Sequence, residues 1–173
     1  QIQDYENQGY QLVDNSYPQG GATFSQDGTV MNYNIYLKHK DDNNPTGLDL
    51  NHTVTETIKY VYSNGKEVAP SKTVTLTFHR DATKDDVTGK VIYGAWTPID
   101  GTNFPAVDSP AITGYTPSQS VVNAINDVSE ATPDYTTTVT YTPNQEKATV
   151  TYIDDTTGKT ITVANLTGAY DTT

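Results

Sequence analysis

The 173-residue chain contains no cysteine and few basic residues. Without cysteine, it has no disulfides, no thiolate metal ligands and no cysteine nucleophile. Ten Lys and Arg residues stand against 21 Asp and Glu, which gives a net charge of -11 and a pI of about 4.4. This balance argues against a nucleic-acid partner, because binding to a phosphate backbone depends on Lys and Arg.

Long apolar runs are also missing. Hydrophobic residues make up 34% of the chain and the mean hydropathy is -0.60. No run approaches the roughly 18 apolar residues that a membrane span needs, so we expect no membrane insertion. Charged residues are only 18% of the chain, which differs from the composition of charge-driven disorder. The length allows one domain or two small ones.

The residues used in excess are threonine and tyrosine, with 13 Tyr against 3 Phe and 1 Trp. Both favour strands and tolerate water on one side. Period-2 alternation and strand-forming residues predict strands at 30–38, 54–62, 74–78, 91–96, 135–141, 148–154 and 160–163. Short helical turns are predicted only at 2–8, ending at Gly9, and at 118–125, with Ser118 as the N-cap. We therefore expect a β-rich α+β fold.

Two stretches read as strand, Gly-Lys turn, strand, one through Gly65 and one through Gly158. Glycine before lysine supplies the positive φ that such a turn needs. A second pattern also recurs, in which Gly114-Tyr115 precedes a strand centred on Val139 and Gly9-Tyr10 precedes one centred on Ile35. The N-terminal forty residues therefore resemble the second half of a module, and the C-terminal residues resemble a first half.

This repetition predicts the domain organisation. Residues 1–40 form the C-terminal half of one module, 41–51 a linker, 52–142 a complete module, and 147–173 the N-terminal hairpin of the next. The chain then looks like a piece of something longer. Both half-modules leave strand edges unpaired, so we expect head-to-tail self-association of neighbouring molecules through the split module. The alternative is that 1–40 folds by itself and 147–173 is a loosely attached hairpin.

No residue pattern indicates catalysis, a metal or a cofactor. The three histidines, His39, His52 and His79, form no zinc-binding motif. Asp154 to Gly158 lacks the alternating oxygen ligands of a calcium loop, and Asp100 and Asp108 lie in Pro- and Gly-containing stretches typical of loops. We therefore predict no catalytic residues, no metal ligands and no cofactor, and no individual binding residue is assigned.

The aromatic residues are the remaining candidates for binding. Trp96 is interpreted as a core or half-buried anchor of the middle module, with a sugar-stacking platform as the alternative. Tyr93 and Trp96 have opposite parity, as have Tyr33 and Tyr36, so the two rings of each pair should lie on opposite faces of a strand. One Tyr of each pair should then be partly exposed, which suits glycan or protein ligands.

Several spaced blocks of sequence resemble a known family. ATVTYIDDTTGKTI, with GYQLV and YNIYLKHK, is similar to the mucin-binding (MucBP) domain of lactic-acid bacteria. TETIKYVYSNGKEVAPSKTVTLTFHR, VTGKVIYGAWTPIDGTNFPAV and SPAITGY resemble its partner domain in the repeats of Lactobacillus mucus-binding (Mub) proteins. The order departs from a simple MucBP domain, because that domain is split across the two ends of the chain.

The resemblance implies an extracellular adhesin repeat, cell-wall-anchored on a Gram-positive bacterium, with no enzymatic activity. It implies two ubiquitin-like β-grasp modules, which we expect in an elongated end-to-end arrangement. The expected partners are mucin glycoproteins, bound non-covalently with avidity from repetition. Two alternatives stay open: an immunoglobulin-binding module that acts by strand-edge pairing, and a passive spacer in a surface adhesin.

Overall fold

The computed structural model describes residues 1–24, 28 and 30–172, and the chain forms two compact units. Unit 1 comprises Gln1–His52 and Phe78–Thr97, and unit 2 comprises Thr53–Thr77 and Pro98–Thr173. Strands β4 (Asn51–Tyr62) and β5 (Glu67–His79) contribute residues to both units. The fold is β-rich, with a single short helix among the described residues.

Unit 1 contains the helix and two small antiparallel sheets. Its elements are α1 (Ile2–Glu6), β1 (Tyr10–Asn15), β2 (Ile35–His39), β3 (Asp41–Asp42), β6 (Ala82–Asp85) and β7 (Val91–Tyr93). Strand β1 pairs with β2, and β6 lies between β3 and β7. The predicted helix is confirmed, and Gly9 follows it with φ +93°. This left-handed conformation turns the chain directly into β1.

The strand predicted at 30–38 begins only at Ile35. Just before it, the Asn34 N–H donates to the Ser16 hydroxyl oxygen at 2.8 Å. The Asn34 carbonyl accepts both the Ser16 N–H and the Ser16 hydroxyl at 3.0 Å. A side-chain hydroxyl thus takes the place of a backbone partner, and the regular ladder ends at this point.

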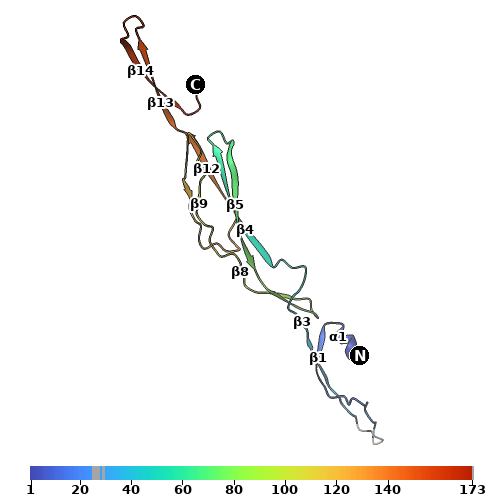
Figure 1. Ribbon diagram of the computed structural model, residues 1–173. Coiled ribbons are helices and arrows are strands. Elements are labelled where there is room, and N and C mark those ends of the chain that lie inside the picture. The colour runs from blue at the N-terminus through green and yellow to red at the C-terminus, as the bar shows by residue number, and fades with distance from the viewer. Residues whose placement is uncertain (25–27, 29, 173) are drawn as a thin grey trace. The chain divides into compact units, whose positions relative to one another are not determined.

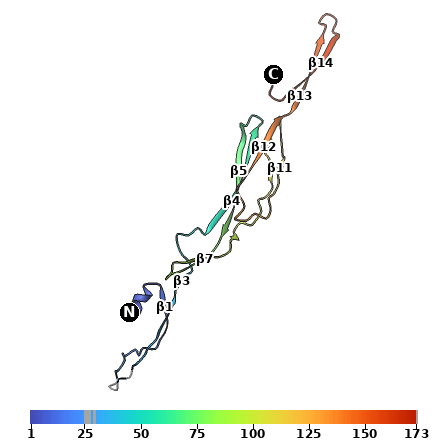
Figure 2. The same cartoon turned by 180° about the vertical axis from the view of Figure 1, so that it is seen from behind.

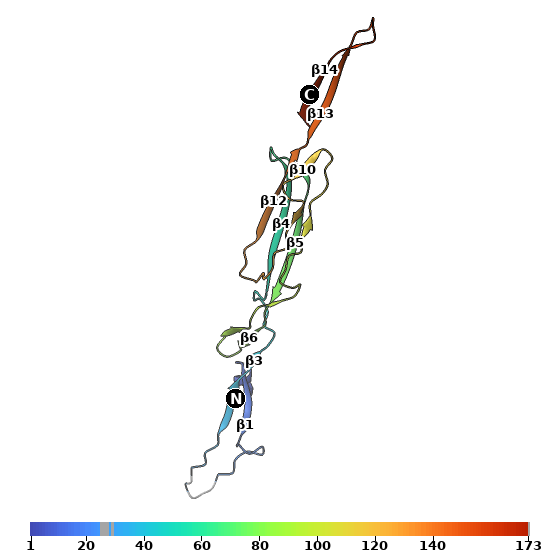
Figure 3. The ribbon, with the colours of Figure 1, turned by 90° about the vertical axis from the view of Figure 1, so that its left-hand side faces the viewer.

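Unit 2 holds most of a five-stranded sheet with the strand order β10-β12-β4-β5-β8 (Figure 1). The remaining strands are β8 (Thr97–Pro98), β9 (Val107–Asp108), β10 (Tyr115–Pro117), β11 (Val121–Val122), β12 (Tyr135–Pro143), β13 (Gln145–Ile153) and β14 (Thr160–Ala169). Strand β12 runs parallel to β4, whereas β10 is antiparallel to β12 (Figure 3). Strands β13 and β14 form a separate two-stranded sheet.

The hydrophobic core lies in unit 2, on one face of β4 and β12. Burial alternates along β4, which follows from period-2 patterning with one covered face. Its central buried residues are Ile58, Tyr60, Val107, Val122, Val139 and Tyr141. The Tyr141 hydroxyl donates to the Pro110 carbonyl oxygen at 2.6 Å, so this buried phenol has a polar partner.

The helix predicted at 118–125 is wrong. The segment contains β11, which is labelled in Figure 2 and pairs with β9, and Val122 is buried in the core. The Ser118 hydroxyl accepts the Thr140 N–H at 3.0 Å, and the Ser118 N–H donates to the Thr140 carbonyl. The side chain that was expected to cap a helix therefore extends the pairing of β12 instead.

Segment 41–51 contains β3 and the first residue of β4. The split-module boundaries and the β-grasp assignment stay predictions.

Candidate functional site

The most elaborate surface cluster of unit 1 surrounds Arg80, which is the only arginine of the chain. The Cζ atom of Arg80 lies 3.9 Å from the ring centroid of Tyr93 and 4.4 Å from that of Trp96. Both distances are well within the range of a cation–π contact, and such contacts contribute about 0.5–2 kcal/mol each. We call these three residues the Arg80 cluster.

Backbone acceptors fix the orientation of the guanidinium. The Nε and Nη2 groups of Arg80 donate to the Asp49 carbonyl oxygen at 3.2 and 3.1 Å. The Arg80 backbone N–H donates to the Leu50 carbonyl at 2.9 Å, so both main chain and side chain are tied to the same segment. Within the described part of the chain, the other guanidinium N–H groups have no protein acceptor. They remain available to an external acceptor.

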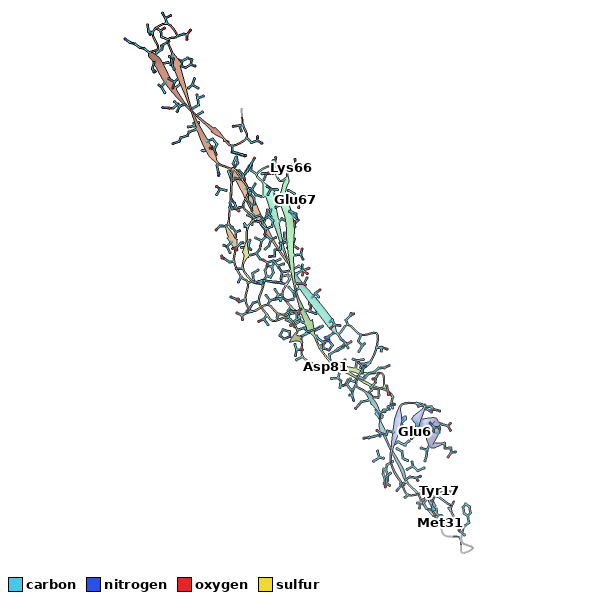
Figure 4. The ribbon with its side chains drawn as sticks, in the orientation of Figure 1. Glu6, Tyr17, Met31, Lys66, Glu67 and Asp81 are labelled. Atoms are coloured by element: carbon cyan, nitrogen blue, oxygen red, sulfur yellow. The ribbon has the colours of Figure 1, made fainter. Side chains whose placement is uncertain are left out.

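The two rings meet at Arg80 because strand β7 ends at Tyr93. The Gly94 N–H then donates to the Asp81 carbonyl at 2.8 Å. This hydrogen bond ties the residue after β7 to the residue after Arg80. The Thr97 hydroxyl donates to the His79 carbonyl at 3.0 Å and holds the next segment in place. Asp81 is labelled in Figure 4 and marks where the cluster lies along the chain.

The predicted placement of Tyr93 and Trp96 on opposite faces of one strand is therefore wrong. Parity assigns faces only while the chain stays extended, and the strand ends before Trp96. The same guanidinium contacts both rings. Trp96 is half-buried, and Tyr93 remains 43% exposed. The predicted exposure of one Tyr in this pair is confirmed.

Polar side chains surround the cluster. The exposed His52 ring has its centroid 6.2 Å from that of Trp96. His79 Nδ1 lies 2.8 Å from the Asn51 Oδ1 atom, and its Nε2 lies 3.5 Å from an Asp81 carboxylate oxygen. The surface thus combines aromatic faces with hydrogen-bond donors and acceptors. This combination suits stacking and hydrogen bonding with an amphipathic ligand.

His39, the remaining histidine, belongs to a different structural contact. Its Nδ1 atom lies 2.8 Å from the Asp85 Oδ2 atom. The other carboxylate oxygen of Asp85 accepts the N–H groups of Val87 and Thr88 at 2.8 and 3.0 Å. These backbone donors and His39 hold the pKa of Asp85 well below its usual range. The group organises the β6–β7 turn.

Asp154 has a similar role in the β13–β14 turn. Its Oδ1 atom accepts the Thr156 N–H at 2.9 Å, and its Oδ2 atom accepts the Thr157 hydroxyl at 2.7 Å. These bonds lower the pKa of Asp154 and occupy both oxygens with the turn itself. No cluster of three or more metal-ligating side chains occurs within residues 1–24, 28 and 30–172.

Unit 1 also has a hollow, which is lined by Tyr17, Ala22, Phe24, Val30, Met31 and Tyr33. Tyr17 and Met31 are labelled in Figure 4, and the Tyr17 and Tyr33 rings are in edge contact with centroids 5.2 Å apart. In the sequence, Phe24 precedes and Val30 follows a stretch in which residues 25–27 and 29 lie outside the described residues.

Family comparisons agree with this fold. A Muc B2-like domain matches residues 46–145, and a mucin binding domain matches residues 1–39. The crystal structure of Mub-RV is 36% identical in sequence, covers 83% of this chain and 79% of that chain, and has a TM-score of 0.69. The type 2 repeat of the mucus binding protein MUB from Lactobacillus reuteri is 34% identical, with coverages of 83% and 80% and a TM-score of 0.56. Among curated proteins, no sequence matches.

These findings show the class of protein: the molecule is a β-rich repeat of the adhesin type. More narrowly, the chain belongs to the family of mucus-binding (Mub) repeats with Muc B2-like and MucBP-type domains. The resemblance drawn from the spaced sequence blocks is confirmed. None of the described helices is long and apolar enough to cross a bilayer.

Proposed function

We propose that this chain is an extracellular repeat of a Gram-positive cell-wall adhesin, and that it binds mucin glycans through the Arg80 cluster. Its family and the mucus binding protein from which one structural neighbour comes support the ligand class. The observation that carries the residue assignment is the single arginine held by Asp49 against two partly accessible rings. A saccharide is amphipathic, so ring faces and polar donors can contact it together.

Recognition of the sugar would use the two aromatic ring faces and the guanidinium N–H groups that Asp49 does not bind. The apolar C–H face of a sugar ring stacks on Tyr93 or Trp96, while its hydroxyl oxygens accept guanidinium N–H groups. Arg80 is already oriented by its backbone acceptors and rings, so little side-chain entropy is lost when a ligand binds. A single site of this kind is weak. Repetition along a tethered array raises the effective concentration at a mucus gel and supplies avidity.

Removing the Trp96 ring is expected to weaken binding to immobilised mucin by at least about tenfold, or about 1.4 kcal/mol. Trp96→Ala removes one stacking surface and loosens the guanidinium, whereas Trp96→Phe should recover part of the affinity. Ile92→Ala is the matched control, because Ile92 is exposed beside Tyr93 on β7. Equilibrium binding by surface plasmon resonance measures the effect. Equal affinities of Trp96→Ala and Ile92→Ala would remove the Arg80 cluster from the proposal.

The ligand class has its own test. Stripping O-glycans from the mucin should abolish binding. Raising the salt concentration from about 0.05 to about 0.5 M should change affinity little, because stacking and hydrogen bonds from Arg80 to uncharged hydroxyl groups are weakly screened. If the protein still binds the deglycosylated ligand and also binds purified immunoglobulin, strand-edge pairing is favoured instead. No measurable affinity for either ligand would favour a passive spacer.

A further inference from the structure

The β13–β14 hairpin carries an apolar face that nothing in the described chain covers. The apolar side chains on that face are Ala148, Val150, Tyr152, Ala164 and Leu166, and it also carries Glu146 and Thr162. Val150, Tyr152 and Leu166 are 37%, 53% and 52% exposed. An isolated two-stranded hairpin is marginally stable in water, so such a face needs a partner.

The same chain contains an intact counterpart of this hairpin, formed by β4 and β5. At the tip of β4–β5 the Tyr62 N–H donates to the Lys66 carbonyl, and at the tip of β13–β14 the Asp154 N–H donates to the Lys159 carbonyl, both at 2.8 Å. Each lysine follows a glycine with positive φ, Gly65 or Gly158. Asp154 is therefore equivalent to Tyr62.

This equivalence fixes the rest of the strand. Counting back from the tips aligns Tyr152 with Tyr60 and Val150 with Ile58. Tyr60 and Ile58 are 2% and 0% exposed in the core of unit 2. The residues that are open on β13 thus occupy the positions that are buried on β4.

The element that pairs with β4 also has a counterpart. Strand β12 pairs antiparallel with β10, Tyr115 opposite Pro143, and β2 pairs antiparallel with β1, Tyr10 opposite His39. The next bond matches as well, since the Asn144 N–H donates to the Gly114 carbonyl and the Lys40 N–H to the Gly9 carbonyl, both at 2.8 Å. Strand β2 is therefore equivalent to β12.

Strand β12 shows how the missing partner is arranged. It runs parallel to β4 with Val139 opposite Tyr60 and Thr140 opposite Val61. Transferred to the open hairpin, this register places Ile35 of β2 opposite Tyr152 and Tyr36 opposite Ile153. Strands β1 and β2 have no fully buried residue, and a hollow beside them is lined by Gln1, Ile2, Tyr5, Ile35 and Leu37.

We infer that β2 of one copy adds in parallel to β13 of a second copy, in this register, and completes a module between chains. The apolar face of the hairpin then packs against Ile35, Leu37 and the apolar side of α1. Strands β1–β2 and β13–β14 form two separate two-stranded sheets, and each sheet has strand edges open to pairing. The assignment commits the surface to a second copy of this chain and is independent of the glycan proposal.

Disulfide trapping tests the register directly, because the chain has no cysteine of its own. Tyr36→Cys and Ile153→Cys are made in separate chains, mixed, and oxidised mildly. Adjacent strands place opposed Cα atoms within the 4.4–6.8 Å that a disulfide needs, so a covalent heterodimer should form. Ile161→Cys on β14 is the matched control, exposed but one strand further away. Its yield with Tyr36→Cys should be at least about tenfold lower.

A second pair of variants tests the packing. Val150→Asp, placed in the Ile153→Cys chain, puts a charge on the apolar face and should abolish the heterodimer. Thr149→Asp lies on the opposite face of the same strand and should leave it intact. Equal trapping with Ile153→Cys and Ile161→Cys overturns the inference. The inference is also overturned if a Tyr36→Cys/Ile153→Cys double variant forms its disulfide within a monomer.

Discussion

Replacing Glu56 with methionine is expected to raise the free energy of unfolding by about 1–3 kcal/mol at pH 7. Glu56 is 1% exposed on β4, and neither of its carboxylate oxygens has a hydrogen-bond partner among the described residues. Burial raises the pKa of Glu56 above its ordinary value of 4.5. Methionine has a similar volume and no polar oxygen to leave unpaired, so it removes this cost.

The effect should depend on pH in a defined direction. A carboxyl whose folded pKa is raised binds its proton more tightly in the folded state. Its contribution to stability is therefore fully present below the unfolded pKa and is lost as pH rises through the folded pKa. The advantage of Glu56→Met should be smaller at pH 4 than at pH 7. Urea denaturation at the two pH values measures this difference.

Glu67 supplies the control for this prediction. It begins β5, is exposed, and is labelled in Figure 4. Glu67→Met makes the same chemical change without relieving burial, so it should alter stability by less than about 0.5 kcal/mol. A Glu56→Met variant that is less stable than the original chain at pH 7 would show that the carboxylate contributes favourably.

Substituting Gly9 by alanine is expected to destabilise unit 1 by about 2–4 kcal/mol. Gly9 has φ +93°, and a Cβ atom there would lie 2.6 Å from the backbone carbonyl carbon and oxygen of Asp86. Backbone cannot move aside as a flexible side chain can. Two costs therefore combine: the left-handed conformation of a non-glycine residue and a clash with the β6–β7 turn.

A Gly47→Ala variant separates the conformational cost from the cost of the clash. Gly47 also has positive φ, +78°, but nothing lies within 4 Å of its added Cβ. Gly47→Ala should lose only the conformational part, about 1–2 kcal/mol. Amide hydrogen exchange in β6 and β7 should report the larger loss for Gly9→Ala. Equal protection in the two variants would contradict the close packing of Gly9 on Asp86.

The strands were predictable where the sheet has two different faces. Alternation along β4 matches its alternation of buried and exposed side chains, and the Gly-Lys turns marked both hairpins. The helix before Gly9 was predictable because glycine provides a local stop signal. In each case the signal resides in neighbouring residues.

The failures depended on contacts that are distant in sequence. Ser118 is a good helix N-cap by residue type, but the Thr140 backbone captures its hydroxyl. Trp96 follows Tyr93 by an interval that predicts opposite faces, but strand β7 ends at Tyr93.

The Arg80 cluster was missed for a related reason. A lone arginine has no pattern around it, and its partners Asp49 and Trp96 come from segments on either side of it in the chain. The only available signal was its uniqueness in a chain of charge -11, close to the single tryptophan.

The parallel pairing of β12 with β4 has a mechanical consequence. The chain enters the paired region at Glu56 on β4 and leaves it at Tyr141 on β12, and seven residue pairs join the two strands. Tension applied to the chain on both sides of the module would pull parallel neighbours in opposite directions along their length. Shear of this kind loads all the inter-strand hydrogen bonds at once, whereas peeling would break them one after another. The topology is therefore suited to resisting tension along the chain.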